Sequence, residues 1–230
     1  FASGLSFLSS YAWSKSIDDG SGISTGSDSS GVAQNARNLR AERAASDYDV
    51  AHRWVLSYVY DLPFGKGKRI APSSKVADIL VSGWQMTGIL TMQTGRPFTV
   101  TVGRDQSATG GNADRPNLVG DPKVSDPGPD RWFNPAAFAV PAAGAFGNAG
   151  RNILRGDGLH NFDVGVSRFF RVTERQSFQF RGEVFNLTNH PNFFFPTASL
   201  ASSAVGAITR AANTGAGAQR QIQFALKYIF

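Results

Sequence analysis

The sequence predicts an all-β protein whose antiparallel strands carry one apolar face and one polar face. Three observations support this fold class: apolar and polar residues alternate with a period of two, aromatic residues are abundant, and helical periodicity is weak. The 230 residues include 18 phenylalanines, and only 17% are charged, against roughly 25% in ordinary soluble domains. No apolar run approaches the ~20 residues of a membrane-spanning helix.

The alternation predicts about six strands and no long helix. The expected strands cover residues 4–15, 53–62, 80–94 (or on to 102), 161–172, 177–188 and 220–230. The first and third rest on weaker patterns. The other four carry apolar residues at even positions, namely Trp54, Leu56, Tyr58 and Tyr60; Phe162, Val164, Val166 and Phe170; Phe178, Phe180 and Val184; and Ile222, Phe224, Leu226, Tyr228 and Phe230. Successive side chains of a strand point to opposite faces, so these residues share one face of the predicted sheet.

Polar residues occupy the opposite face of the same four strands. The set is Arg53, Asp61, Asp163, Arg171, Gln179, Arg181, Glu183, Gln221 and Lys227. We interpret it as a hydrated wall that contacts a solute or a plug, or as a wall whose side chains pair with one another. Arg168 departs from the pattern, because strict alternation points its side chain to the apolar face.

The connections between the strands alternate strictly between long and short. Residues 17–52, 103–160 and 189–219 form long connections rich in Gly, Ser, Asn and Pro, whereas 63–78 and 173–176 are shorter. In an up-and-down sheet this puts all long loops at one end. Outer-membrane barrels have this arrangement, with short periplasmic turns, long extracellular loops and aromatic girdles. Trp13, Trp54, Trp84 and Tyr228 stand at strand ends, as a girdle requires. The alternative is a secreted soluble β-sandwich that binds glycans.

The last residues add a second signal for a barrel. Gln223, Ala225, Tyr228 and Phe230 follow the pattern of the C-terminal signal that the barrel-assembly machinery recognises in bacterial outer-membrane proteins, with Ala225 where Gly is usual. About six strands cannot close a membrane barrel, since the smallest have eight. The first residue is Phe and already lies in a strand-like stretch, so we expect residues 1–230 to be the C-terminal strands of a larger barrel.

No catalytic, metal or nucleic-acid site emerges from the sequence. The net charge is +6, but the basic residues are scattered, and their densest group is Lys66, Lys68 and Arg69, so no nucleic-acid partner is expected. Cysteine is absent. The three histidines, His52, His160 and His190, lack metal-ligand spacing, and Asp18, Asp19 and Asp28 lack a calcium-loop pattern. We therefore expect no cofactor and no enzymatic activity.

Nine segments together resemble one known family. They are Tyr11–Asp19, His52–Ser57, Tyr60–Gly67, Gly83–Gln85, Thr94–Phe98, Trp132–Pro135, Phe138, Gly147–Asn152 and Glu183–Phe193. As a set they are similar to the barrel ends of Oar-like TonB-dependent receptors of acidobacterial type, which often carry a carboxypeptidase-regulatory-like domain. The resemblance implies a barrel of about 22 strands around a plug. It also implies a Gram-negative outer membrane, energy from the TonB system through an N-terminal part outside these residues, and uptake of an unidentified bulky solute. A structural or adhesive outer-membrane barrel is the alternative within this class.

Overall fold

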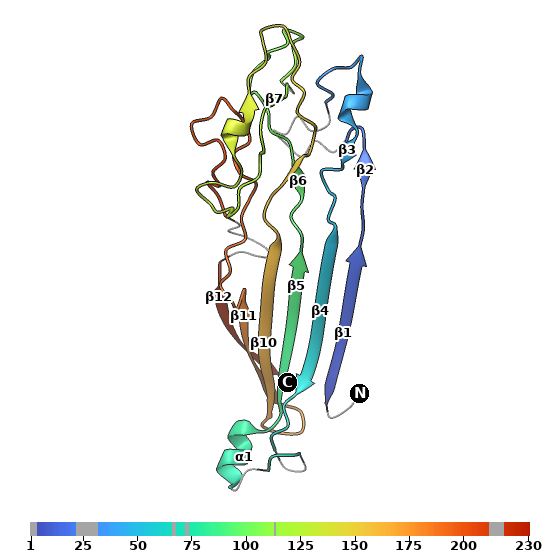
Figure 1. The fold of residues 1–230 in the computed structure, drawn as a ribbon. Coiled ribbons are helices and arrows are strands. Elements are labelled where there is room, and N and C mark those ends of the chain that lie inside the picture. Colours follow the sequence, from blue (N-terminus) through green and yellow to red (C-terminus); the bar gives the residue numbers. More distant parts are fainter. Residues whose placement is uncertain (1–3, 22–31, 66–67, 72–73, 113, 212–218) are drawn as a thin grey trace.

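The computed structural model describes residues 4–21, 32–65, 68–71, 74–112, 114–211 and 219–230. Its main element is a six-stranded sheet in the order β1-β4-β5-β10-β11-β12, in which every neighbouring pair is antiparallel (Figure 1). The strands are β1 (Leu5–Trp13), β4 (His52–Asp61), β5 (Trp84–Gln93), β10 (Leu159–Arg171), β11 (Ser177–Phe185) and β12 (Gln221–Ile229). Each long strand thus pairs with the next long strand along the chain, which is the predicted up-and-down order.

The remaining elements are short and lie at the two ends of this sheet. They are β2 (Ile17–Asp18), η2 (Leu39–Glu42), β3 (Ala44–Ala45), α1 (Lys75–Val81), β6 (Pro97–Phe98), β7 (Asn117–Leu118), η3 (Pro135–Ala137), β8 (Phe138–Ala139) and β9 (Leu154–Arg155). Figure 1 shows the three long connections gathered beyond one end of the long strands, with α1 and the β10–β11 turn at the other. No helix among the described residues is long and apolar enough to cross a membrane.

The predicted strands are confirmed to within about three residues at their ends, with two corrections at β5. The expected strand 80–94 begins only at Trp84, because residues 75–81 form α1, whose amino end is capped by the Ser74 hydroxyl. The extension to 102 is wrong. Beyond Gln93 the chain leaves the sheet, and β6 pairs with β9 in a separate two-stranded sheet.

The register gives the sheet one continuous apolar face. Trp54 lies opposite Tyr11 and Met92, and the same row continues through His160. At the other end, Trp84 lies opposite Arg168, which in turn lies opposite Phe180. Even-numbered residues of β4, β5, β10, β11 and β12 therefore share a face with odd-numbered residues of β1. Much of this face is exposed in the described chain, including Phe7, Tyr11, Trp13, Phe224 and Leu226.

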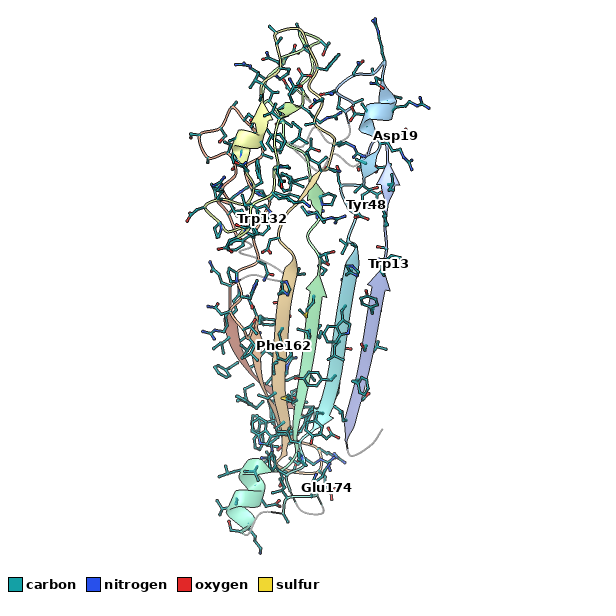
Figure 2. The ribbon with its side chains drawn as sticks, viewed as in Figure 1. Trp13, Asp19, Tyr48, Trp132, Phe162 and Glu174 are labelled. Carbon is teal, nitrogen blue, oxygen red and sulfur yellow. The ribbon has the colours of Figure 1, made fainter. Side chains whose placement is uncertain are left out.

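The main buried apolar cluster lies outside the sheet, in the long connections. It consists of Phe98, Val100, Phe133, Ala137, Phe138, Ala149 and Leu154, with Trp132, Ala198, Leu200 and Val205 packed against it. These residues come from 98–154 and from 198–205, so described parts of the second and third long loops form one packed unit (Figure 2). We call the folded parts of the three long loops the loop cap. The sequence predicted long loops there, but not that they share a hydrophobic core.

Candidate functional site

The polar face of the sheet is hollowed. Side chains from β1, β4, β5, β10 and β11 line a hollow of about 410 Å³, and its wall mixes apolar and acidic residues. Leu8, Val59, Ile89 and Phe185 supply the apolar part, and Asp163 and Glu183 the acidic part. A hollow that extends over five neighbouring strands indicates that this face is the concave one. In a closed barrel the concave face lines the lumen.

All nine polar residues predicted for this face lie at positions that the register places on it. Several pair within the wall. The Gln85 amide donates to Asp61 at 3.0 Å, Arg181 forms an ion pair with Glu183, and Asp163 accepts the backbone N–H of Asn186 at 2.8 Å. No side-chain hydrogen bond to another described residue is seen for Arg53, Arg171, Gln179, Gln221 and Lys227. Among the described residues, these five side chains of the polar face therefore form no hydrogen bond with the rest of the wall.

The predicted assembly signal lies on the edge strand of the sheet. In β12, Gln223 pairs with Glu183 and Ala225 with Arg181, both on the polar face. Tyr228 lies on the apolar face, where its ring is 5.0 Å from that of Phe178 and 5.7 Å from that of Phe230. Phe230 is 90% exposed. The two aromatic residues of the signal therefore stand together at the short-turn end of the sheet, accessible to a partner.

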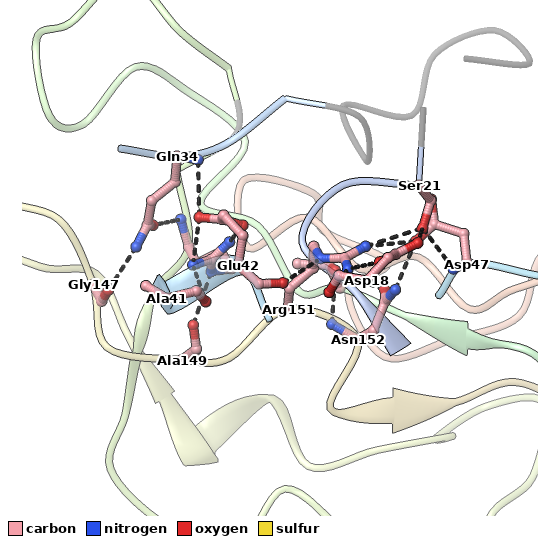
Figure 3. A network of polar contacts seen from close by, with 12 residues as sticks. Asp18, Ser21, Gln34, Ala41, Glu42, Asp47, Gly147, Ala149, Arg151 and Asn152 are labelled. Atoms are coloured by element: carbon pink, nitrogen blue, oxygen red, sulfur yellow. Dashed lines mark hydrogen bonds and ion pairs between the residues drawn. The ribbon is translucent and has the colours of Figure 1, made fainter. Parts of the chain in front are cut away.

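The loop cap contains a fully buried ion pair that joins the first long loop to the second. The Arg115 guanidinium contacts both carboxylate oxygens of Glu42, at 2.5 and 3.0 Å, and the two side chains are 3% and 1% exposed. Arg115 also donates to the backbone carbonyls of Ala41 and Ala149, and Gln34 donates its backbone N–H to Glu42 (Figure 3). The pair is thus saturated with hydrogen bonds, which is what a buried pair needs to persist.

A second set of contacts ties the first two loops together beside this pair. The Arg151 guanidinium donates to the carbonyl of Glu42, to the Ser21 hydroxyl and to Asp18, and it forms an ion pair with Asp47 (Figure 3). Asn152 bonds Asp47 through its amide at 2.6 Å. One asparagine and one arginine thereby fix both described ends of the first loop against residues 147–155.

Arg155 completes the attachment near the sheet. Its guanidinium forms an ion pair with Asp49 and donates to the Gly95 carbonyl at 3.0 Å. Asp49 also accepts the backbone N–H of Ser16 at 2.7 Å. The link holds together the segments next to β1, β4 and β5 at the end of the sheet where the loop cap begins.

Hydrogen bonds lower the pKa of two carboxyls in this network. Burial raises the pKa of Asp18, but hydrogen bonds from Ser21 and Arg151 outweigh burial, so the pKa lies below the ordinary 3.8. The pKa of Asp49 is lowered in the same way, with burial opposed by Arg155 and by the backbone N–H of Ser16. Both groups are therefore carboxylates at neutral pH, and both link segments of the loop cap through hydrogen bonds.

Comparison with known families identifies the class of protein to which this sheet and its loop cap belong. Residues 1–223 match the sequence model of the outer membrane beta barrel domain family. The chain belongs to this family. The outer-membrane location predicted from the sequence is confirmed, and so is the barrel class of the sheet, which remains open at β1 and β12 within the described residues. No curated protein and no solved structure matches the chain. The Oar-like, TonB-dependent subtype stays a prediction.

Several sequence motifs on which the family resemblance rests have structural roles in this outer-membrane barrel domain. Asn186, with φ +49°, follows the end of β11, and its amide group bonds the backbone of His190 in both directions. Asn192 donates to the His160 carbonyl and accepts the His160 N–H at 2.7 Å. At Gly147 an added Cβ would lie 2.1 Å from the Arg115 carbonyl oxygen, so the approach of these loops requires glycine.

The three histidines do not form a metal centre in the part of the chain that the structure describes. His160 and His190 do come together, with ring centroids 5.2 Å apart, but His52 instead bonds the Tyr11 hydroxyl at 2.8 Å. No group of three or more potential ligands is present among the described residues. Asp18 forms an ion pair with Arg151, and Asp28 lies outside the described residues, as do Lys66 and Gly67 of the shorter connection 63–78.

A small recess opens between the first two loops of the barrel domain. Its volume is about 290 Å³, and amide side chains of Gln34, Asn35, Asn38 and Asn148 dominate its wall. Sequence reasoning missed this recess and the buried Glu42–Arg115 pair beside it. The only sequence signal nearby was the Gly147–Asn152 motif, because the pair joins residues far apart in the chain.

Proposed function

We propose that this chain is the C-terminal barrel segment of a TonB-dependent receptor that takes up a bulky solute. Its loop cap would bind the solute outside the cell, and the hollowed polar face would line the path past a plug. No bond is made or broken in this account, and no cofactor takes part. The proposal extends the family assignment with the resemblance carried by segments such as Thr94–Phe98 and Glu183–Phe193.

The observation that carries the proposal is that the folded loop cap stands at one end of the sheet whose polar face is hollowed (Figure 1). Two arginines hold the cap directly above the strand ends: the buried Arg151, which contacts Asp18, and the more exposed Arg155, which contacts the buried Asp49. The hollow below it offers both apolar and acidic groups, so it suits a large amphipathic solute better than a small ion. The amide-lined recess adds hydrogen-bonding groups to the outer surface.

A depletion experiment tests the proposal even though the solute is unidentified. Cells that express the full-length protein, and cells that carry an empty vector, are grown with and without a functional TonB system, and solutes lost from a complex medium are measured by mass spectrometry. We expect at least one solute to be depleted only when both the receptor and TonB are present. Transport of this kind would be contradicted if a solute were depleted equally with and without a functional TonB system. It would also be contradicted if a correctly assembled protein depleted no solute.

An adhesive barrel is the second candidate, and one observation favours it. Exposed apolar residues stand on the outer surface of the cap, among them Val119 at 62% and Val140 at 44% exposure. Adhesion of the same cells to a glycan- or protein-coated surface, lost in a Val119→Asp, Val140→Asp variant and independent of TonB, would support this function. The transport proposal expects no such TonB-independent loss.

A further inference from the structure

Arg168 lies on the apolar face of the sheet, near the end with the short turns. It stands three residues before the end of β10, at Arg171, which is about 10 Å along the strand. Its neighbours across the sheet are Trp84, the first residue of β5, and Phe180 of β11. In an outer-membrane barrel the short turns are periplasmic, so Arg168 lies near the interface of the periplasmic leaflet.

The Arg168 guanidinium is enclosed, and two of its nitrogens lack a hydrogen-bond partner. The residue is only 8% exposed, and its Nε and Nη1 atoms are buried without a partner. The charge lies over the rings of Phe170, at 4.5 Å, and Trp84, at 5.9 Å. No carboxylate of the described chain forms an ion pair with it. Nη2 is the guanidinium nitrogen left with access to the surface.

An enclosed cation in this position requires an anion. A buried charge costs free energy unless a partner pairs with it, and contacts with aromatic faces offset only part of that cost. A planar guanidinium forms its strongest pairs with carboxylates and phosphates. Since the described residues supply neither here, the anion comes from the surroundings of the apolar face, which in the outer membrane are lipid.

Helix α1 extends the same surface toward the periplasm. The Trp84 indole N–H donates to the Leu80 carbonyl at 2.9 Å, which holds the end of α1 beside the apolar face. Val76, Ile79 and Leu80 have helical spacing i, i+3, i+4, and each is more than 60% exposed. The described part of this turn also exposes basic residues, namely Lys68, Arg69 and Lys75. An apolar helix face beside basic side chains is typical of segments that lie in an anionic membrane surface.

We propose that Arg168, the Trp84–Phe170 aromatic pair and α1 form a binding site for the headgroup of an anionic glycerophospholipid in the periplasmic leaflet. The phosphodiester oxygens accept hydrogen bonds from the Arg168 guanidinium. The acyl chains follow the aromatic wall of the sheet, and the apolar face of α1 lies in the interface beside them. The site does not depend on whether the barrel transports a solute.

Native mass spectrometry of the full-length protein in detergent tests this site. Phosphatidylglycerol and diacylglycerol, which has the same acyl chains but no phosphodiester, are added in parallel, and the number of bound lipid molecules is measured. The wild type should prefer phosphatidylglycerol by about tenfold, equivalent to one charge-assisted hydrogen bond, and Arg168→Gln should reduce this preference to less than about twofold. Arg171→Gln is the matched control, since it removes the same charge from the same strand on the opposite face.

Two further measurements, on a variant of α1 and on competition by inorganic phosphate, complete the test. An Ile79→Asn, Leu80→Asn variant changes a helix that has no buried residue, so the sheet should fold normally while lipid binding falls. Inorganic phosphate at an equal phosphate concentration should not displace the lipid. Full competition by inorganic phosphate would assign the site to a free anion and overturn the lipid proposal. An unchanged lipid preference in a folded Arg168→Gln protein, judged by heat-modifiable mobility, would overturn it as well.

Discussion

The carboxylate of Glu42 and the guanidinium of Arg115 meet inside the loop cap through two hydrogen bonds, and both side chains are almost completely shielded from solvent. The pair joins two loops that the sequence separates by 73 positions. It converts long, Gly-rich connections into one body held above the sheet.

Removing one partner of this pair should loosen the cap. Glu42→Gln leaves Arg115 buried without a counter-charge, at a cost of about 3–5 kcal/mol in local stability. Hydrogen exchange in residues 34–42 and 147–152 of the full-length protein should accelerate accordingly. Glu183→Gln is the control, because its pair with the half-exposed Arg181 contributes about 0–1 kcal/mol. Equal exchange in both variants would show that the buried pair does not hold the cap.

Acid should loosen the cap as well. Because Asp18 and Asp49 have a lowered pKa in the folded state, their contribution to stability is complete above the unfolded value, about 4, and is lost as the pH falls through the folded value. Protease resistance of the cap should therefore stay constant from neutral pH down to about 4 and decline below it. Asp49→Asn should lower resistance at neutral pH and weaken the acid response. Loosening of the wild-type cap already above pH ~5 would point to other groups.

The close approach at Gly147 should tolerate no side chain. An alanine Cβ would lie 2.1 Å from the Arg115 carbonyl oxygen, so Gly147→Ala must shift one of the two backbone segments, at a cost of about 1–3 kcal/mol. Gly128→Ala is the control, since nothing lies within 4 Å of its added Cβ. Limited proteolysis of the intact protein should cleave the cap faster only in the Gly147 variant. Equal cleavage of the two variants would mean that the segments do not pack as described.

Substitutions on the two faces of the last strand, β12, should have different effects on assembly. Leu226→Arg places a charge on the lipid face at a cost of about 2–4 kcal/mol near the midplane, whereas Lys227→Leu changes the opposite face. Surface abundance and heat-modifiable mobility of the full-length protein should fall more for Leu226→Arg. Deletion of Phe230 should lower assembly in cells but spoil refolding in detergent much less. If Leu226→Arg and the deletion both assemble like wild type, β12 is not a barrel strand.

The strands were predictable because the alternation of apolar and polar residues, with a period of two, is visible within a few consecutive residues. Trp54, Leu56 and Tyr58 reveal a face by their spacing alone, and the even-numbered face then follows through β4 to β12. Arg168 was correctly assigned to that face by the same rule. The beginning of β5 was missed because Ile79, Leu80 and Val81 are apolar in a helix or a strand alike, and only the Ser74 cap distinguishes the two.

The loop cap could not be predicted in the same way. Its contacts join distant residues, as with Arg155 and Asp49, and no period marks them in the sequence. Composition was also misleading there. Glycine and asparagine suggested open loops, whereas Asn152 and Asn186 adopt positive φ within hydrogen-bonded turns, and Gly95 and Gly147 allow backbones to touch.

Spin labels on β10 of the full-length protein, reconstituted in lipid vesicles, test the central claim most directly. Single labels replace Val164 and Val166 on the apolar face and Asp163 and Ser167 on the polar face, and collision rates with oxygen and with a polar nickel chelate are measured. We predict high oxygen accessibility at Val164 and Val166, and higher nickel than oxygen accessibility at Asp163 and Ser167. Four positions with equal access to the nickel chelate would contradict a lipid-facing sheet.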